Sequence, residues 1–459
     1  MKVLFIVVAS LALLHPALGE RSSASNPSRP ADNRFFPSTL STTAHTGQAP
    51  PALPAIQGVF GSPVTFATHA QLQGYGYGFG PSDSQFGAIP AGNGTYTFYG
   101  AAGNTSASAC AGTPKAMNGA FTFTGTLDRV TGSDCKRLFG LGDGPAGWVF
   151  DRDYAGGGQV VRFASGGKSG WLMPFHAEFH WSNPATSDGK CNGNTCFYAS
   201  IGLAVSTDDG KTFKVVGQIY QPSQPLSFFT DSGTIMSVGD GSLVVADANG
   251  QHLDNPPADP NNAYFYLFSG DRLPSAPGAC ARFGCIGVAR APYADLVAAA
   301  LSGDPHAVAT VFHKYDGASP DSWTQPATSD TPDESGTAGA YEPIWTDKPG
   351  GVPSVIYDGS FNIYLAACLV NPTGKLLGIE VRASSDLLHW SGPLDAYSEP
   401  GRALYYPDLL GETGDPTIGG PVPRVYFTSF PTGGFPSWSD TVFESVPLTL
   451  SSNVGGGPP

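Results

Sequence analysis

The chain has 459 residues, a formal net charge of −14 at pH 7 and a charged fraction of only 13%. Its lysines and arginines form no cluster, which argues against nucleic acid and anionic membrane surfaces as partners. After the first residues, no stretch approaches the roughly 20 apolar residues that a membrane-spanning helix needs.

The N-terminus has the pattern of a secretory signal peptide. Lys2 supplies a positive charge, an apolar run extends from Val3 to Leu14, and Ala17-Leu-Gly19 is a small-x-small cleavage site. The apolar run is too short to span a bilayer. We therefore expect residues 1–19 to be removed and the mature protein to be secreted, either extracellular or periplasmic.

Composition divides the rest of the chain into three parts. Residues 20–55 are rich in Ser and Pro and lack apolar periodicity, so we expect a disordered tether. Residues 56–451 are long enough for one large β domain. Residues 452–459 are predicted to form a flexible tail.

Seven cysteines are consistent with an oxidising compartment. Their spacing predicts three disulfides, Cys191–Cys196, Cys280–Cys285 and Cys110–Cys135, and leaves Cys368 unpaired in a buried strand. The alternative, a zinc site, is disfavoured because neither close pair has the C-x-x-C spacing.

The domain is predicted to be all-β. Sixty glycines and 41 prolines are spread through the chain and separate short β-prone runs, which leaves little room for helices. The best helical window is Tyr293 to Leu301. Asp240-Gly241 and Asp358-Gly359 are predicted hairpin turns.

A weak repeat predicts the architecture. A strand followed by an acidic turn recurs at intervals of about 80 to 95 residues, enough for one blade with long loops. We expect a five-bladed β-propeller whose blades consist mostly of four antiparallel strands. Because the last unit lacks a strand, residues 56–66 are expected to complete it and close the ring, which removes the exposed sheet edges.

Two motifs carry a resemblance to known families. Ser206-Thr-Asp208-Asp-Gly210-Lys-Thr-Phe213 matches the Asp box of sialidase-like propellers, a structural turn. Ser384-Ser-Asp386-Leu-Leu-His-Trp390 resembles a pattern in the outer strands of five-bladed glycosidases, the arabinofuranosidase, xylosidase and invertase relatives. The resemblance implies a glycosidase-like propeller that acts on carbohydrate.

The segment around Glu178 is the leading candidate for chemistry. In a strand, alternation places His176, Glu178 and His180 on one face. Three interpretations are open: a satisfied polar cluster, a catalytic Glu178 whose flanking histidines orient it and bind substrate, or a metal site formed by all three residues. We expect no cofactor, apart from a divalent metal under the third interpretation.

Glycoside hydrolysis normally requires a second carboxylate. Asp231 and Asp408 are the catalytic candidates, and Glu342 is a candidate for substrate binding because it lies between aromatic residues. Tyr405 and Tyr406 precede Asp408 and could stack on a sugar ring. Asp358 is assigned to its turn.

The leading hypothesis is a secreted glycoside hydrolase that acts on a poly- or oligosaccharide through carboxylates at the propeller centre. The alternative is a non-catalytic carbohydrate-binding or adhesion propeller. It is favoured by the sequence Phe86-Gly-Ala-Ile-Pro90, which stands where the resembled glycosidases carry an Asp-Pro motif on their first blade.

Overall fold

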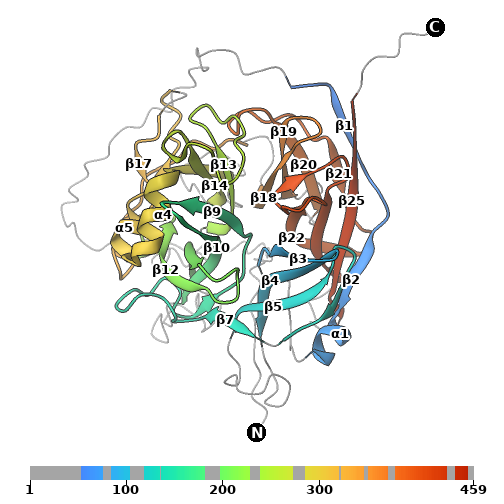
Figure 1. The fold of residues 1–459 in the computed structure, drawn as a ribbon, viewed down its shortest axis with the longest axis horizontal. Helices are drawn as coiled ribbons and strands as arrows, with labels where there is room; N and C mark the ends of the chain where they lie inside the picture. Colours follow the sequence, from blue (N-terminus) through green and yellow to red (C-terminus); the bar gives the residue numbers. More distant parts are fainter. Residues whose placement is uncertain are drawn as a thin grey trace, which may run out of the picture.

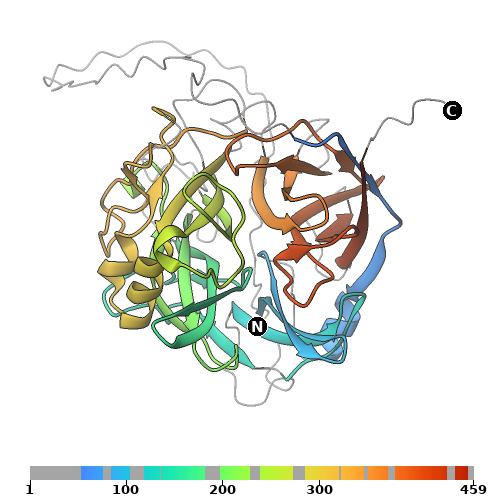
Figure 2. The ribbon, with the colours of Figure 1, turned by 45° about the horizontal axis from the view of Figure 1, so that its top comes forward.

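The computed structural model contains five small β-sheets arranged around a common axis, a five-bladed β-propeller (Figures 1 and 2). The predicted fold class is therefore confirmed. The structure describes residues 53–75, 84–103, 118–134, 136–180, 197–227, 238–271, 285–319, 322–345, 350–370, 378–431 and 440–452.

The first three blades follow one another along the chain. Blade 1 contains β3 (Gly87–Gly92), β4 (Thr95–Gly103), β5 (Asn118–Thr126), β6 (Arg129–Gly132) and β7 (Arg137–Gly140). Blade 2 contains β8 (Tyr154–Ala155), β9 (Val161–Ser165), β10 (Lys168–His180), β11 (Phe197–Ser206) and β12 (Lys214–Tyr220). Blade 3 contains β13 (Val238–Ala246), β14 (Tyr264–Asp271), β15 (Cys285–Pro292), β16 (His313–Lys314) and β17 (Gln325–Pro326).

The last two blades are linked by chain exchange. Blade 4 contains β18 (Gly350–Asp358), β19 (Ile363–Val370), β20 (Gly378–Ser384), β21 (Asp395–Tyr397) and the short parallel strand β23 (Ile418–Gly419). Blade 5 contains β22 (Arg402–Leu410), β24 (Arg424–Pro431), β25 (Val442–Ser452), β1 (Ile56–Phe60) and β2 (Val64–Thr68). Because β23 comes from the β22–β24 connection, blade 5 also reaches back into blade 4.

The N-terminal strands close the ring as predicted. Both β1 and β2 pair antiparallel with β25, the last strand of the chain, and lie beside it along its length in Figure 1. The edge of β25 is thereby covered by strands nearly 400 residues away in sequence, and this pairing locks the first and last parts of the domain together.

Apolar side chains fill each of the five interfaces between neighbouring blades. The alternation along each strand sends successive side chains to the two interfaces that a blade shares with its neighbours. Leu365 of β19, for example, packs toward blade 5, whereas Tyr364 and Ala366 pack toward blade 3. Phe66, Phe86, Tyr426 and Phe443 form an aromatic cluster that seals the interface between blades 5 and 1.

Helices are few in the described chain and lie outside the sheets. The predicted helical window is confirmed by α4 (Tyr293–Ser302), whose buried face packs in the core between blades 2 and 3. Shorter elements are α1 (His69–Gly74), α5 (Pro305–Ala309) and the 3-10 turn η2 (Pro260–Asn262). None of the described helices is long and apolar enough to cross a bilayer.

Polar side chains join the innermost parts of four of the five pairs of neighbouring blades around the axis. Each bond runs from a main-chain N–H of one blade to a side-chain oxygen of the preceding blade. The bonds are Leu243 N to Gln159 Oε1 at 2.8 Å, Val355 N to Ser242 Oγ at 2.9 Å, Leu409 N to Ser354 Oγ at 2.9 Å and Phe86 N to Asp408 Oδ2 at 3.0 Å. We call these four bonds the axial ring.

Two glutamines also cross between blades that are not neighbours. Gln85 Nε2 donates to Pro353 O of blade 4 at 2.7 Å, and Gln159 Nε2 donates to Val355 O, also of blade 4, at 3.0 Å. Both glutamines are buried. Side-chain amides therefore occupy the middle of the propeller.

Two sequence expectations can be assessed only in part. Cys368 is free and buried, as predicted. Cys285 is disulfide-bonded, but Cys280 and the other four cysteines lie outside the described residues, so the three pairings stay predictions. The signal peptide, most of the tether and the tail also lie outside them.

Candidate functional site

The site is built around the end of β10. This strand is a regular partner of β11 from Trp171 to His180, so His176, Glu178 and His180 share one face, as the sequence alternation predicts. Phe175 and Ala177, on the other face of the strand, are buried in the interface with blade 1.

The two histidines bind the two carboxylate oxygens of Glu178. His176 Nε2 lies 2.9 Å from Oε1, and His180 Nε2 lies 2.6 Å from Oε2. Because an ionised carboxylate only accepts hydrogen bonds, both Nε2 atoms carry a proton in this arrangement. The ring of Tyr154 packs edge-on against His176 at 5.7 Å.

These contacts determine the charge of Glu178, whose side chain is 14% exposed. Burial alone would raise its pKa, but the hydrogen bonds from His176 and His180 outweigh burial and lower the pKa to about 2. Glu178 is therefore ionised at neutral pH. A carboxylate in this state accepts a proton and does not donate one.

Two buried acids lie next to this group at the axis. Gln85 N donates to Asp240 Oδ1 at 3.1 Å, and Phe86 N donates to Asp408 Oδ2 at 3.0 Å. Because the two amides are consecutive, the two carboxyl groups are brought close together, although Asp240 is in blade 3 and Asp408 in blade 5.

The pKa values of these two acids shift in the direction opposite to that of Glu178. Burial raises the pKa of Asp408 well above its ordinary value, and the neighbouring Asp240 raises it further. Burial also raises the pKa of Asp240, with His176 opposing and Glu178 reinforcing the shift. Asp240 thus interacts electrostatically with both Glu178 and Asp408, and we call Glu178, His176, His180, Asp240 and Asp408 the axial acid cluster.

Asp240 was missed as a site residue because Asp240-Gly241 was assigned to a hairpin turn. That prediction is wrong: both residues lie within β13, at a shift in register between Val238 and Gly241. A turn instead follows β13 at residues 247–250, where Gly250 has a φ of 75°. An Asp-Gly pair is favoured both in β-bulges and in turns, so the sequence does not show which of the two it forms. The pairing of β13 with β14 decides it.

The turn prediction for Asp358 is confirmed. Asp358 ends β18, and its Oδ1 accepts the amides of Ser360 and Phe361 at 2.9 and 3.0 Å. The connection to β19 has four residues, 359–362, instead of two.

The predicted tyrosines lie in the middle of β22, two and three residues before Asp408. Tyr406 has a φ of 51°, and the strand register shifts between Tyr405 and Asp408. Asp408 and Ser242 occupy equivalent positions in the axial ring. Tyr406 precedes Asp408 by two residues, and Asp240 precedes Ser242 by the same spacing in blade 3. Left-handed backbone at a tyrosine before a proline is strained and recurs at functional sites.

The remaining candidates are placed elsewhere. Glu342 lies by the outer strands of blade 3, where its amide donates to Tyr315 O at 2.8 Å and its side chain packs on Gly317. The structure does not bring it into the axial acid cluster. Asp231 lies outside the described residues.

The metal interpretation of the histidines finds no matching geometry in the described chain. Both Nε2 atoms face the oxygens of Glu178 instead of converging with them on a common point. Among the described residues, no group of three His, Cys, Asp or Glu side chains is arranged to hold a metal ion.

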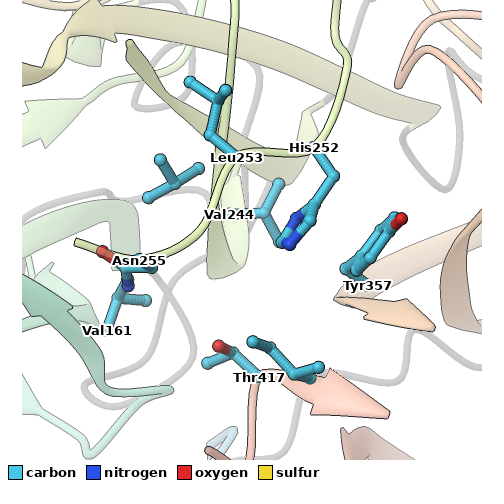
Figure 3. A pocket seen from close by; sticks show the side chains of 9 residues that line it. Val161, Val244, His252, Leu253, Asn255, Tyr357 and Thr417 are labelled. Atoms are coloured by element: carbon cyan, nitrogen blue, oxygen red, sulfur yellow. The ribbon is translucent and has the colours of Figure 1, made fainter. Parts of the chain in front are cut away.

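A cavity lies at the other end of β13 from Asp240 (Figure 3). Its polar lining comes from His252, Asn255 and Thr417, and His252 stacks on Tyr357 with ring centroids 3.5 Å apart. The cavity has room for about one water molecule, too little for a sugar ring.

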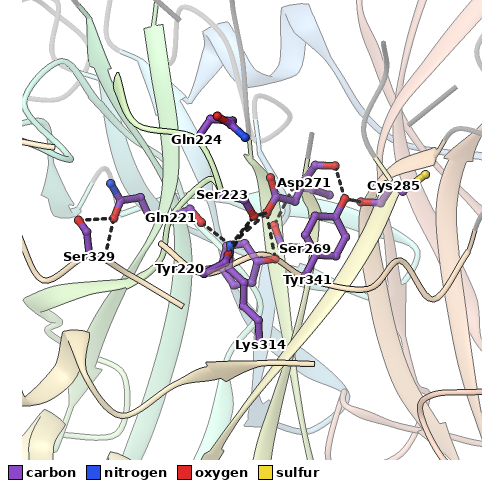
Figure 4. Close-up of polar contacts among 12 residues, drawn as sticks. Tyr220, Gln221, Ser223, Gln224, Ser269, Asp271, Cys285, Lys314, Ser329 and Tyr341 are labelled. Atoms are coloured by element: carbon purple, nitrogen blue, oxygen red, sulfur yellow. Dashed lines mark hydrogen bonds and ion pairs between the residues drawn. The ribbon is translucent and has the colours of Figure 1, made fainter. Parts of the chain in front are cut away.

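A second polar cluster lies between blades 2 and 3 (Figure 4). Lys314 Nζ is fully buried and donates to Gln221 O at 2.8 Å, to Ser223 Oγ at 3.2 Å and to Asp271 Oδ2 at 3.2 Å. These three acceptors match the three protons of the ammonium group. We therefore assign this cluster to the structure of the blade interface.

Fold and cluster together define a five-bladed β-propeller with an acid–histidine cluster at its axis. No protein-family model and no curated protein sequence matches the chain. Solved structures with a similar fold include a GH62 hydrolase in complex with xylotriose, with 11% identity, a TM-score of 0.45 and coverage of 86% of this chain and 97% of that one. Another is an α-L-arabinofuranosidase from Podospora anserina in complex with cellotriose, with 11% identity, a TM-score of 0.45 and coverage of 87% and 98%.

The catalytic domain of a GH62 α-L-arabinofuranosidase from Coprinopsis cinerea has 10% identity and a TM-score of 0.46, and the match covers 87% of this chain and 98% of that one.

Proposed function

We propose that this protein is a secreted glycoside hydrolase whose base is Glu178 and whose acid is drawn from Asp408 and its neighbour Asp240. The observation that carries the proposal is one cluster in which the carboxyl pKa values shift in opposite directions. Two histidines lower the pKa of Glu178, while burial raises the pKa of Asp240 and that of Asp408.

Such a division is what acid–base hydrolysis of a glycosidic bond needs. An ionised carboxylate accepts a proton from the attacking water, the oxygen of that water bonds to the anomeric carbon, and the C–O bond to the leaving group breaks. A protonated carboxyl group supplies the proton that the leaving oxygen takes up. The choice of carbohydrate as substrate follows from the sequence resemblance.

The partly exposed side chains of the cluster indicate where a sugar would lie. The side chains of Glu178 and His180 are 14% and 23% exposed, more than that of His176. Tyr405 and Tyr406 are partly buried and precede Asp408. We assign sugar binding to these tyrosines and to the two histidines.

The test is release of reducing sugar from arabinoxylan, arabinan, galactan and microbial polysaccharides. Glu178→Gln preserves the shape of the side chain but removes the carboxylate, so we expect activity to fall by at least about 100-fold. Glu412→Gln, which changes an exposed glutamate paired with Arg424, is the matched control and should keep full activity. Undiminished activity in folded Glu178→Gln would remove Glu178 from the mechanism.

A non-catalytic carbohydrate-binding propeller is the second candidate. It is favoured by the burial of Asp240 and Asp408, each of which already accepts a main-chain amide. A glycan array separates the two candidates, because binding without release of sugar would support this one.

Secretion is part of the proposal and rests on residues 1–19. Expression of the full chain in a secreting host should yield a mature N-terminus at Glu20, identified by mass spectrometry of the secreted protein. Retention of an intact Met1 in the cell would contradict it.

A further inference from the structure

The segment just before the innermost strand of blade 2 runs along the end of β10. Asp153 N donates to Glu178 O at 3.1 Å, and Gly156 N donates to His176 O at 2.8 Å. Tyr154 and Ala155 form β8, which pairs with Glu178 and Ala177. The main chain on both sides of Glu178 is therefore held by residues 153–156.

Two side chains of the same segment hold the last residue of β10. Asp153 Oδ2 accepts the amide of His180 at 2.7 Å, and Arg152 donates through Nη2 to the carbonyl of His180. Arg152 also donates from Nε to Asp153 Oδ2 at 2.9 Å, and its guanidinium lies 4.1 Å above the ring of Phe179. Both main-chain polar groups of His180 are thus bound by one ion pair.

The bonds from Arg152 and Asp153 to the main chain of His180, which we call the His180 clamp, hold one of the two histidines that contact Glu178. With its amide and carbonyl held, His180 places Nε2 at 2.6 Å from Glu178 Oε2. From this geometry we infer that Asp153 is a positioning residue, which acts through His180 to keep Glu178 in its two-histidine cradle. Its catalytic consequence rests on the proposed function, whereas the positioning itself can be measured without activity.

An exposed ion pair would be the simpler explanation, since the Arg152 side chain is 47% exposed. Exposed pairs contribute little to stability, typically below about 1 kcal/mol. The two explanations differ in what the loss of Asp153 does. If the pair has no role beyond the surface, loss of Asp153 leaves His180 in place. If the pair is a clamp, loss of Asp153 releases the amide of His180 and weakens the contact of His180 with Glu178.

The chain offers a matched control for this test. Asp143 Oδ2 accepts the amide of Gly140 at 2.8 Å and pairs with Arg137 Nη2 at 3.0 Å, the same chemistry at a position away from β10. We compare Asp153→Ala, Asp153→Asn and Asp143→Ala. Asp153→Asn keeps an oxygen that can accept the His180 amide, so it separates the hydrogen bond from the charge.

The first readout is NMR on the full-length protein with labelled histidine. In Asp153→Ala we expect the amide of His180 to exchange with solvent at least about tenfold faster and the Nε2–H signal of His180 to lose its hydrogen-bonded shift. Asp153→Asn should retain most of the protection, and Asp143→Ala all of it. Wild-type protection of His180 in Asp153→Ala would overturn the inference.

The second readout is kcat on whichever polysaccharide the wild-type protein cleaves. Asp153→Ala should lower kcat at least tenfold, and Asp153→Asn should recover most of it. Equal kcat in Asp153→Ala and Asp143→Ala would overturn the inference. If the wild-type protein cleaves none of the polysaccharides, the proposed function fails, and the NMR comparison alone decides whether the clamp exists.

Discussion

Asp408 of β22 accepts the main-chain amide of Phe86 of β3 at 3.0 Å, and this bond joins the last blade of the propeller to the first. The equivalent joints of the axial ring use Ser354 and Ser242, which are neutral hydroxyls. An acid therefore occupies a structural position where a hydroxyl is sufficient. Burying a carboxyl group costs more than burying a hydroxyl, so the extra cost at Asp408 points to a role in addition to the joint.

The first prediction concerns this double role. Asp408→Ser retains a side-chain acceptor for Phe86 N, so we expect its free energy of unfolding to lie within about 1 kcal/mol of the wild-type value. Asp408→Leu loses the acceptor, so we expect its free energy of unfolding to fall by about 1 to 3 kcal/mol. Urea unfolding measures both. If Asp408→Ser is stable but releases no sugar, the acid acts in catalysis; full activity in that variant would assign Asp408 to structure alone.

The second prediction concerns Glu334, a fully buried residue between blades 2 and 3. Its Oε1 accepts a hydrogen bond from Gln218 Nε2 at 2.8 Å, and its Oε2 is buried without a partner. Burial raises the pKa of Glu334 to about 8, with Gln218 opposing and Asp333 reinforcing the shift.

Because this pKa is raised on folding, the native state keeps a proton that the unfolded chain loses near its ordinary pKa of 4.5. The stability that Glu334 contributes is therefore complete below pH 4.5 and falls as pH rises to about 8. Glu334→Gln should gain roughly 4 kcal/mol over the wild type between pH 5 and pH 9, measured by urea unfolding at both values. A constant difference across that range would contradict the assignment.

The third prediction concerns the buried pair of Lys314 and Asp271. Lys314→Met leaves the Asp271 carboxylate without a countercharge and should cost about 3 to 5 kcal/mol of unfolding free energy. The double variant Lys314→Met/Asp271→Leu should recover a large part of that loss, since neither charge is then buried. Arg424→Met breaks the surface pairs with Asp128 and Glu412 and should cost less than about 1 kcal/mol. Equal losses in Lys314→Met and Arg424→Met would refute the structural role.

The fourth prediction concerns the contact between the outer turns of blades 3 and 4. Gly250 has a φ of 75°, and a Cβ there would collide with the main-chain carbonyl of Asp386. Gly250→Ala should therefore cost at least about 2 kcal/mol. Gly359→Ala is the matched control, because an added Cβ there meets nothing within 4 Å. Differential scanning calorimetry should show a lowered Tm for the first variant alone; a normal Tm for Gly250→Ala would mean that the two turns are not in contact.

The sequence by itself determined the features that depend on local pattern. Strand alternation was enough to place His176, Glu178 and His180 on one face of β10, because side-chain direction in a strand follows from residue parity. The helix at Tyr293 and the turn at Asp358 also came from short signals. The missing strand of the last unit, together with the apolar run from Ile56, predicted how the ring closes.

Only the tertiary structure decided which acids share the axis. Asp240 meets Gln85 across 155 residues and Asp408 meets Phe86 across 322, and no local pattern encodes such distances. Whether Asp240-Gly241 formed a turn or a bulge depended on pairing with β14, and whether Glu342 belonged to the site depended on where the outer strands of blade 3 ended. Burial likewise raises the pKa of acids such as Glu334 to about 8, which leaves the group uncharged at neutral pH, and burial is a property of the assembled blades.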